Sequence, residues 1–281
     1  MRIFTLLALG VSTIALSGCS FINGITGGHG HNHHQASNTY GGTYNAGNDD
    51  CCVGQKALST WNLEGGIGKD FTVGGDMFTG DQGHANILGQ TLNSVNMNDA
   101  YDAGIRAAIG TSYALNPNRK ITGQVVYNKA EGNTVTLGQQ GLNALSGTFG
   151  DYESLGVEAG LRQYFTPRVV GSNFGFRPYV EGKMGVAKVK DIDLTHSQAN
   201  VVGATTTEFY DGGWVPSVAG LVGVETIVAK RATIGLETGI RFSQGLDSAD
   251  NLLTNSPQFG GTNNGGERWS VPVTLRGRYR F

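Results

Sequence analysis

A run of histidines is the part of this sequence best suited to bind a metal ion. The candidate ligands are His29, His31, His33 and His34, together with the adjacent pair Cys51 and Cys52. Imidazole suits Zn, Cu and Ni, and thiolate suits Zn and Cu(I). The spacing matches no closed structural zinc pattern, so a solubilising linker is the competing interpretation. The adjacent cysteines are open either to intermolecular bridging or to metal binding.

The remaining histidines offer little for catalysis. They are His84 and His196, and Ser197 follows the second one directly. A His–Ser pair superficially resembles the lipid A deacylase type, which places the two residues two apart on one strand face. Adjacent residues of an extended strand point to opposite faces. We therefore expect no catalytic residues, with a lipid-modifying barrel enzyme as a remote alternative.

The N-terminus has the form of a secretory signal. A short positive start precedes the apolar stretch 3–16, which is too short for a stable transmembrane anchor. It ends in Leu-Ser-Gly-Cys, which resembles the bacterial lipobox. That resemblance implies cleavage before Cys19 and lipidation of its thiol, whereas an ordinary secretory signal with a chance cysteine is the alternative. Two or more acyl chains would anchor the protein stably.

The next segment has a different composition. Residues 20–57 are rich in Gly, Asn, His, Ser and Thr and contain little that could form a core, so we predict a disordered tether. The predicted division is a signal peptide at 1–18, a lipidated tether at 19–57 and an outer-membrane β-barrel at 58–281.

Eight segments alternate between apolar and polar residues with the period of two that is typical of half-buried strands. The predicted strands are 59–70, 99–115, 119–128, 152–165, 176–189, 214–228, 232–246 and 268–281. Tyr101 and Ala103 are placed on the apolar face of the second. Segments of about ten residues with this alternation are typical of membrane barrels.

The connections support the same count. Long polar segments at 70–99, 129–151, 190–213 and 247–266 alternate with short joints at 116–118, 166–175 and 230–231. Long outer loops and short periplasmic turns are typical of bacterial barrels. We expect the loops to be polar, with a solvated rim of carboxylates that could bind divalent cations of the lipopolysaccharide layer.

The polar face of these strands carries charges of both signs. The predicted interior network contains Glu64, Arg106, Glu158, Arg162, Glu181, Lys183, Glu225, Glu237, Arg241, Arg276 and Arg278. Eight strands leave an interior just wide enough for side chains, and unpaired buried charges are costly. The sequence therefore predicts a salt-bridged plug, with a small gated channel as the alternative.

The last strand, residues 268–281, puts aromatic and aliphatic residues on one face and arginines on the other. With Tyr279 and Phe281 at its end, it resembles the terminal strand of bacterial outer-membrane barrels. That resemblance implies recognition by the barrel assembly machinery. Residues 58–281 as a whole resemble the small barrels of the OmpA, OmpX and Opa type in architecture. The resemblance implies a Gram-negative outer membrane, contact with its lipid and lipopolysaccharide, and a role in envelope integrity or adhesion, with a host or surface ligand at the loops.

Composition excludes several other classes. The chain has 45 Gly among 281 residues, 15% charged residues and a formal net charge of −2. This charge argues against a nucleic-acid partner. A soluble eight-stranded barrel such as a lipocalin is disfavoured, because the charged residues share the face opposite Leu, Val and Ile. The main functional alternative is a metal-binding surface lipoprotein that uses the His-rich tether.

Overall fold

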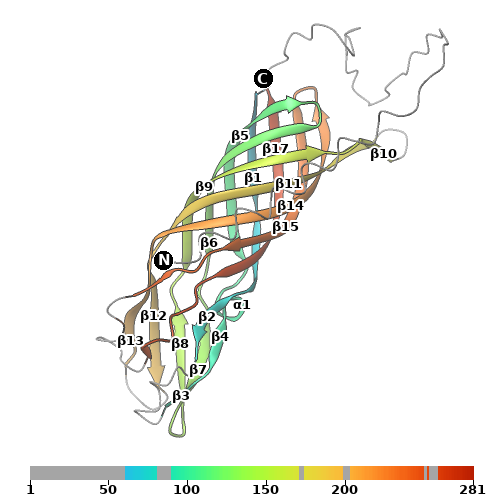
Figure 1. The fold of residues 1–281 in the computed structure, drawn as a ribbon. Coiled ribbons are helices and arrows are strands. Elements are labelled where there is room, and N and C mark those ends of the chain that lie inside the picture. The colour runs from blue at the N-terminus through green and yellow to red at the C-terminus, as the bar shows by residue number, and fades with distance from the viewer. Residues whose placement is uncertain (1–60, 81–89, 171–173, 199–202, 250–251, 253–258) are drawn as a thin grey trace, which may run out of the picture. The chain divides into compact units, whose positions relative to one another are not determined.

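The main feature of the computed structural model is a closed β-barrel (Figure 1). The structure describes residues 61–80, 90–170, 174–198, 203–249, 252 and 259–281. The predicted signal peptide, the lipidation site at Cys19 and the predicted tether lie outside the described residues.

Eight long strands form the barrel, and each pairs antiparallel with the next. They are β1 (Trp61–Gly74), β5 (Gly104–Asn116), β6 (Arg119–Ala130), β9 (Tyr152–Tyr164), β11 (Phe174–Val189), β14 (Trp214–Ala229), β15 (Ala232–Ser243) and β17 (Arg268–Arg280). The pairing of β17 with β1 closes the sheet. The short β10 (Arg168–Val170) pairs with the start of β11. The predicted all-β, eight-stranded, up-and-down barrel is confirmed.

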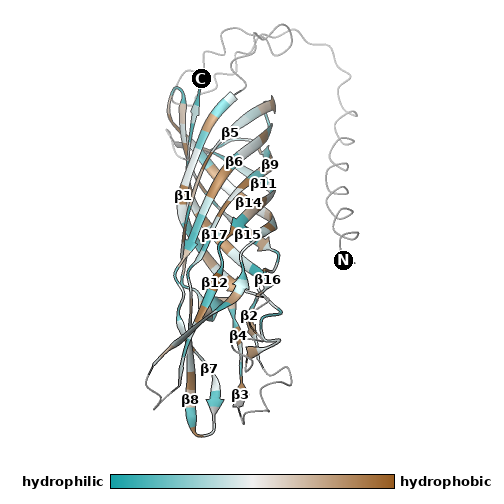
Figure 2. Ribbon diagram, turned by 90° about the vertical axis from the view of Figure 1, so that its left-hand side faces the viewer, coloured by the Kyte–Doolittle hydropathy of each residue, from teal (hydrophilic) through white to brown (hydrophobic). Residues whose placement is uncertain are grey.

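Hydrophilic and hydrophobic residues alternate along the barrel strands (Figure 2), and the apolar ones are mostly exposed whereas the charged ones are mostly buried. Along β1, Leu63 and Ile67 are exposed whereas Asn62 and Glu64 are buried. Along β9, Leu155 and Val157 are exposed and Glu158 is buried. Successive side chains of a strand point to opposite faces, so the sequence alternation is converted directly into two opposite surfaces.

The described parts of the four long outer connections contain short strands and a helix, where the sequence predicted polar loops. They contain β2 (Asp76–Thr79), β3 (Gln90–Leu92), β4 (Ser94–Asn96), α1 (Met97–Ala100), β7 (Thr134–Gln140), β8 (Asn143–Phe149), β12 (Ile192–Gln198), β13 (Thr205–Asp211) and β16 (Asp247–Ser248). Six of these strands form one sheet, in the order β16-β13-β12-β8-β7-β3, and β2 pairs with β4. We call the described parts of residues 75–103, 131–151, 190–213 and 244–267 the cap.

The cap has a hydrophobic core of its own. Phe209 is at its centre, with ring centroids 5.7 Å from Phe78, 5.6 Å from Phe149 and 5.0 Å from Tyr210. All four side chains are buried. The core also takes in residues at the ends of barrel strands, including Val215. The cap therefore packs against the end of the barrel instead of extending from it as separate loops.

Tyr101 illustrates why the sequence prediction failed here. It was placed on the lipid face of the second strand, but β5 begins at Gly104 and Tyr101 is buried in the cap core. Its hydroxyl donates to the carbonyl oxygen of Gly150 at 3.1 Å. Apolar residues of the outer segments form a second core. A prediction that distinguishes only barrel strands from polar loops does not detect it. Among the described residues, no helix could cross a membrane.

The cap core gives a first testable prediction. Replacement of Phe209 by Ala removes three aromatic contacts and should destabilise the cap by about 3–5 kcal/mol. We expect faster proteolysis of the cap strands in detergent, while the barrel still shows heat-modifiable migration in electrophoresis. Leu142, which is fully exposed at the β7–β8 turn, provides the control: Leu142→Ala should cleave like the wild type. Equal protease resistance of both variants would contradict a packed cap.

Candidate functional site in the barrel interior

The charged residues predicted to face inward lie inside the barrel and contact one another. The structure places Glu64, Arg106, Glu158, Arg162, Glu181, Lys183, Glu225, Glu237, Arg241, Arg276 and Arg278 in ion pairs. They come from seven strands and are ordered along the barrel by strand register. The network can therefore be followed from the end with short turns, called the turn end, to the cap.

Glu64 joins two arginines near the turn end. Its carboxylate lies 2.9 Å from Arg162 and 2.9 Å from Arg276. Arg162 is also 2.8 Å from Glu181. Both carboxylates thus share one guanidinium, whose planar fork can donate to two acceptors at once. This group connects β1, β9, β11 and β17.

Glu237 extends the network across the lumen. It lies 2.9 Å from Arg276 and 3.5 Å from Lys183, and it accepts a 3.0 Å hydrogen bond from the Tyr179 hydroxyl. Gly223 makes room for the Tyr179 ring, because a Cβ at position 223 would lie 2.4 Å from the ring carbon Cζ. The glycine is required here by close packing across the interior.

Glu158 holds the middle of the barrel. Arg106 contacts it at 3.0 Å, and Arg241 donates to both of its carboxylate oxygens. The Gln124 amide donates a third contact at 2.8 Å. The side chains of Glu158, Arg106 and Arg241 are all buried.

Two further pairs lie toward the ends. Glu225 pairs with Arg278 at 2.8 Å near the turn end, where the Tyr164 hydroxyl also donates to it. Near the cap, Arg268 contacts Asp70 at 3.2 Å. The Asp70–Arg268 pair was absent from the predicted network. Strand alternation places both residues inward, so the sequence does contain the pattern that predicts this pair. The predicted first strand ends at Asp70, whereas β1 continues to Gly74.

The chemistry of this arrangement is electrostatic. Each buried carboxylate meets at least one cation, which offsets the cost of removing charge from water. The side chains fill the lumen at several levels, as expected for eight strands. The interior can hold the barrel closed and exclude solutes.

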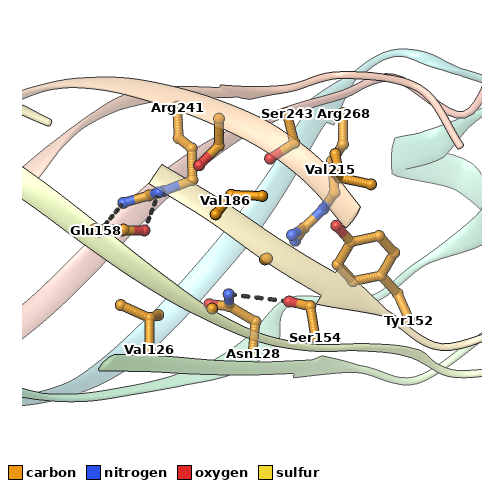
Figure 3. Close-up of a pocket in the computed structure, with 13 residues that line it drawn as sticks. Val126, Asn128, Tyr152, Ser154, Glu158, Val186, Val215, Arg241, Ser243 and Arg268 are labelled. Carbon is orange, nitrogen blue, oxygen red and sulfur yellow. Dashed lines mark hydrogen bonds and ion pairs between the residues drawn. The ribbon is translucent and has the colours of Figure 1, made fainter. Parts of the chain in front are cut away.

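A small cavity lies between the Glu158 group and the cap core (Figure 3). Its walls combine polar residues, including Asn128, Ser154 and Arg268, with apolar ones, including Val126 and Val215. Asn128 donates to the Ser154 hydroxyl at 3.3 Å, and Arg268 lies 4.8 Å from the Tyr152 ring centroid. The cavity marks where the charged interior ends and the apolar cap core begins.

The histidine considered for catalysis is in the cap. His196 and Ser197 are consecutive residues of β12, a strand where the sequence predicted a loop. Their side chains therefore point to opposite sheet faces, and the pair cannot act as base and nucleophile. His196 packs edge-on against Phe259, with centroids 4.8 Å apart, and burial lowers its pKa. A lowered pKa keeps the imidazole neutral at pH 7.

The remaining predicted site residues have other positions. The candidate metal ligands His29, His31, His33, His34, Cys51 and Cys52 lie outside the described residues, and metal binding stays a prediction. Within the described part of the chain, no group of three or more His, Cys, Asp and Glu residues is arranged to hold a metal. Tyr279 and Phe281 are exposed at the turn end and contact each other, with ring centroids 5.7 Å apart.

Comparisons with known proteins give a distant likeness. No family model matches the sequence, and no curated protein matches it. Among solved structures, Neisserial surface protein A is similar over 79% of this chain and 98% of that chain, with 12% identity and a TM-score of 0.38. The attachment invasion locus protein Ail of Yersinia pestis, solved with the heparin analogue sucrose octasulfate, covers 79% and 99%, with 12% identity and a TM-score of 0.32. The outer-membrane protease OmpT of Escherichia coli covers 80% and 98%, with 10% identity and a TM-score of 0.30. Likenesses this weak carry no argument about function, which depends on the chain's own geometry.

Glu158 provides the test of the interior network. Glu158→Gln keeps the shape but leaves Arg106 and Arg241 facing each other without a carboxylate. Loss of one partner from a buried ion pair costs about 3–5 kcal/mol, which we expect as a lower midpoint in guanidinium unfolding of the detergent-solubilised barrel. Glu153→Gln is the matched control, because Glu153 pairs with the largely exposed Lys190, and surface ion pairs contribute little. Identical midpoints for the two variants would refute a stabilising interior network.

Proposed function

We propose that the protein is a non-enzymatic outer-membrane barrel that presents the cap as a surface for interaction or envelope stability. The observation that carries the proposal is the reversal of polarity between its two parts. The barrel exposes Leu, Val and Ile and buries charge, whereas the cap buries Phe, Met and Leu. An apolar outer surface over a charged interior suits a protein surrounded by hydrocarbon, whereas an apolar core suits a protein surrounded by water.

The exposed apolar surface of the barrel supports a membrane setting. Ile67, Ile109 and Met184 are each more than 60% exposed. Burial of apolar surface is worth about 25 cal/mol per Å², so a belt of such residues around all eight strands is unfavourable in water. Monomeric soluble proteins rarely expose apolar patches of this extent.

Aromatic pairs mark both edges of this belt. Trp61 and Tyr113 are neighbours at the turn end, with ring centroids 5.1 Å apart. Phe242 and Trp269 form a similar pair at the cap end, with centroids 4.8 Å apart. Aromatic girdles at the two interfaces are typical of membrane barrels, and they support a span between these two levels.

The cap supports an interaction role because it is preformed. Its sheet and core hold the outer segments in one conformation, which reduces the ordering cost of binding a partner. Lipidation at Cys19, recognition of Tyr279 and Phe281 by the assembly machinery, and contact with lipopolysaccharide belong to the same proposal. The same proposal includes a host or surface ligand bound at the cap.

Cysteine labelling tests the cellular location of the protein and its orientation in the membrane. Leu142→Cys and Lys230→Cys introduce thiols into exposed turns at opposite ends of the barrel, in a background with Cys51 and Cys52 replaced by Ser. We expect a membrane-impermeant maleimide to label Leu142→Cys on intact Gram-negative cells and Lys230→Cys only after lysis. The parent without either substitution gives the background. Labelling of Lys230→Cys on intact cells, with Leu142→Cys protected, would reverse the proposed orientation.

Planar-bilayer recording tests the closed interior. We expect the wild-type protein to show no repeated unit conductance, because side chains of the Glu64 and Glu158 groups fill the lumen. A triple replacement of Glu64, Arg162 and Arg276 by Ala should introduce ion-conducting steps, provided that the variant still shows heat-modifiable migration. Stable unit steps in wild-type recordings would favour a small channel instead.

A further inference from the structure

The charge of the chain is distributed unevenly along the barrel axis. The outer segments carry Asp76, Asp81, Asp99, Asp102, Glu131, Asp151, Asp191, Asp193, Glu208, Asp211, Asp247, Asp250 and Glu267, against the single basic residue Lys190. The turn end has the opposite character. Its described rim carries Arg119, Arg168, Lys230, Arg231 and Arg280. The formal net charge of −2 conceals this separation.

The rim cations lie at the edge of the apolar belt. Arg119 is the first residue of β6 and shares the outward face with Ile121. Its guanidinium donates to Gln163 at 2.7 Å on the outer wall, and the neighbouring Phe165 is exposed. Lys230 and Arg231 form the exposed β14–β15 turn. A cation beside outward-facing Ile and Phe lies at the depth where a membrane's hydrocarbon gives way to its headgroups.

Two more cations inside the mouth of the barrel lack carboxylate partners. Lys120 is 8% exposed and faces the Tyr164 ring at 5.3 Å, yet within the described residues its Nζ has neither an ion pair nor a hydrogen bond. Arg177 is half-buried and lies 4.4 Å from the same ring. Its guanidinium donates to the Pro117 carbonyl oxygen at 2.5 Å and to the Asn118 side-chain oxygen at 2.9 Å, and its Nε is buried with no acceptor among the described residues. Glu225, at the same end of the barrel, is paired with Arg278.

The mouth and the rim therefore present an excess of positive charge that the protein does not neutralise itself. An external anion would neutralise this charge. Guanidinium groups bind phosphate oxygens especially well, through charge-assisted hydrogen bonds.

We propose that the turn end is a binding surface for the phosphate groups of anionic phospholipids in the leaflet that faces the short turns. This inference rests on the proposed membrane span. The position of Arg119 beside the apolar belt favours lipid over a soluble polyanion, because a headgroup there is already at the level of the side chain. Basic residues near an anionic leaflet each contribute roughly a fivefold gain in affinity.

Spin-labelled lipids in bilayers of neutral phosphatidylcholine measure this preference. The full-length protein is reconstituted, and electron paramagnetic resonance gives the association constant of phosphatidylglycerol relative to phosphatidylcholine. The test variant is Arg119→Gln/Lys230→Gln/Arg231→Gln. The matched control, Lys69→Gln/Lys129→Gln/Lys188→Gln, removes the same charge from outward positions of the barrel strands nearer the cap.

We expect wild type and control to prefer phosphatidylglycerol by about fivefold or more. The preference should fall to near unity in the rim variant and in 1 M NaCl, which screens exposed charges. Equal association of both lipids with the wild type would overturn the proposal. An equal decrease of the lipid preference in the rim variant and in the control would also overturn it. A rim variant that keeps its lipid preference but loses binding to purified peptidoglycan would overturn it as well. Heat-modifiable migration of every variant separates these outcomes from failure of the barrel itself.

Discussion

The pairing of opposite charges inside the barrel is the interaction on which the rest of the structure depends. Glu64 meets Arg162, which is 98 positions away in sequence, and Arg276, which is 212 positions away. Such contacts form only when β1 lies between β17 and β5 in the observed register. A shift of one residue in any strand would move its charges to the outer wall. The network therefore favours a single register and one closed barrel over alternative pairings.

The cap buries its apolar residues and exposes its charged ones, which is the opposite of the barrel. This reversal occurs within a continuous stretch of chain. Along β11, Val180 and Met184 face outward and Glu181 and Lys183 face inward. A few residues later, Ile192 and Leu194 of β12 are buried in the cap core while Asp193 between them is exposed. The two consecutive exposed residues Lys190 and Asp191 interrupt the alternation at the boundary. Beyond them it resumes with a period of two, but the apolar residues now point inward. In the proposed membrane setting, the medium around the protein changes at this boundary from hydrocarbon to water, which accounts for the reversal.

The sequence predicts the barrel well because alternation, connection length and interior charge are all local signals. Strand boundaries such as those of β6 and β15 are within a few residues of the predicted ones. The cap was missed because its strands are short and its apolar residues, such as Phe78, Phe149 and Phe209, are dispersed among Gly, Asn and Thr in different segments. Their contacts are long-range, and nothing in one segment indicates that the next contributes to the same core. The sequence also did not predict which residues pair with each other inside the barrel. Strand alternation shows that Glu158 faces inward, but it does not show which of several arginines contacts it.

The paired interior bears on where the proposed function is carried out. With Glu158 bound by Arg106, Arg241 and Gln124, a solute would have to displace paired charges to pass, and separation of a buried pair costs several kcal/mol. The proposed function therefore places activity at the two ends, which differ in chemistry. The cap offers an acidic exterior over a rigid core, whereas the turn end offers arginine and lysine beside exposed Ile and Phe. Of the two ends, the turn end is therefore the one suited to bind an anionic leaflet through direct charge attraction.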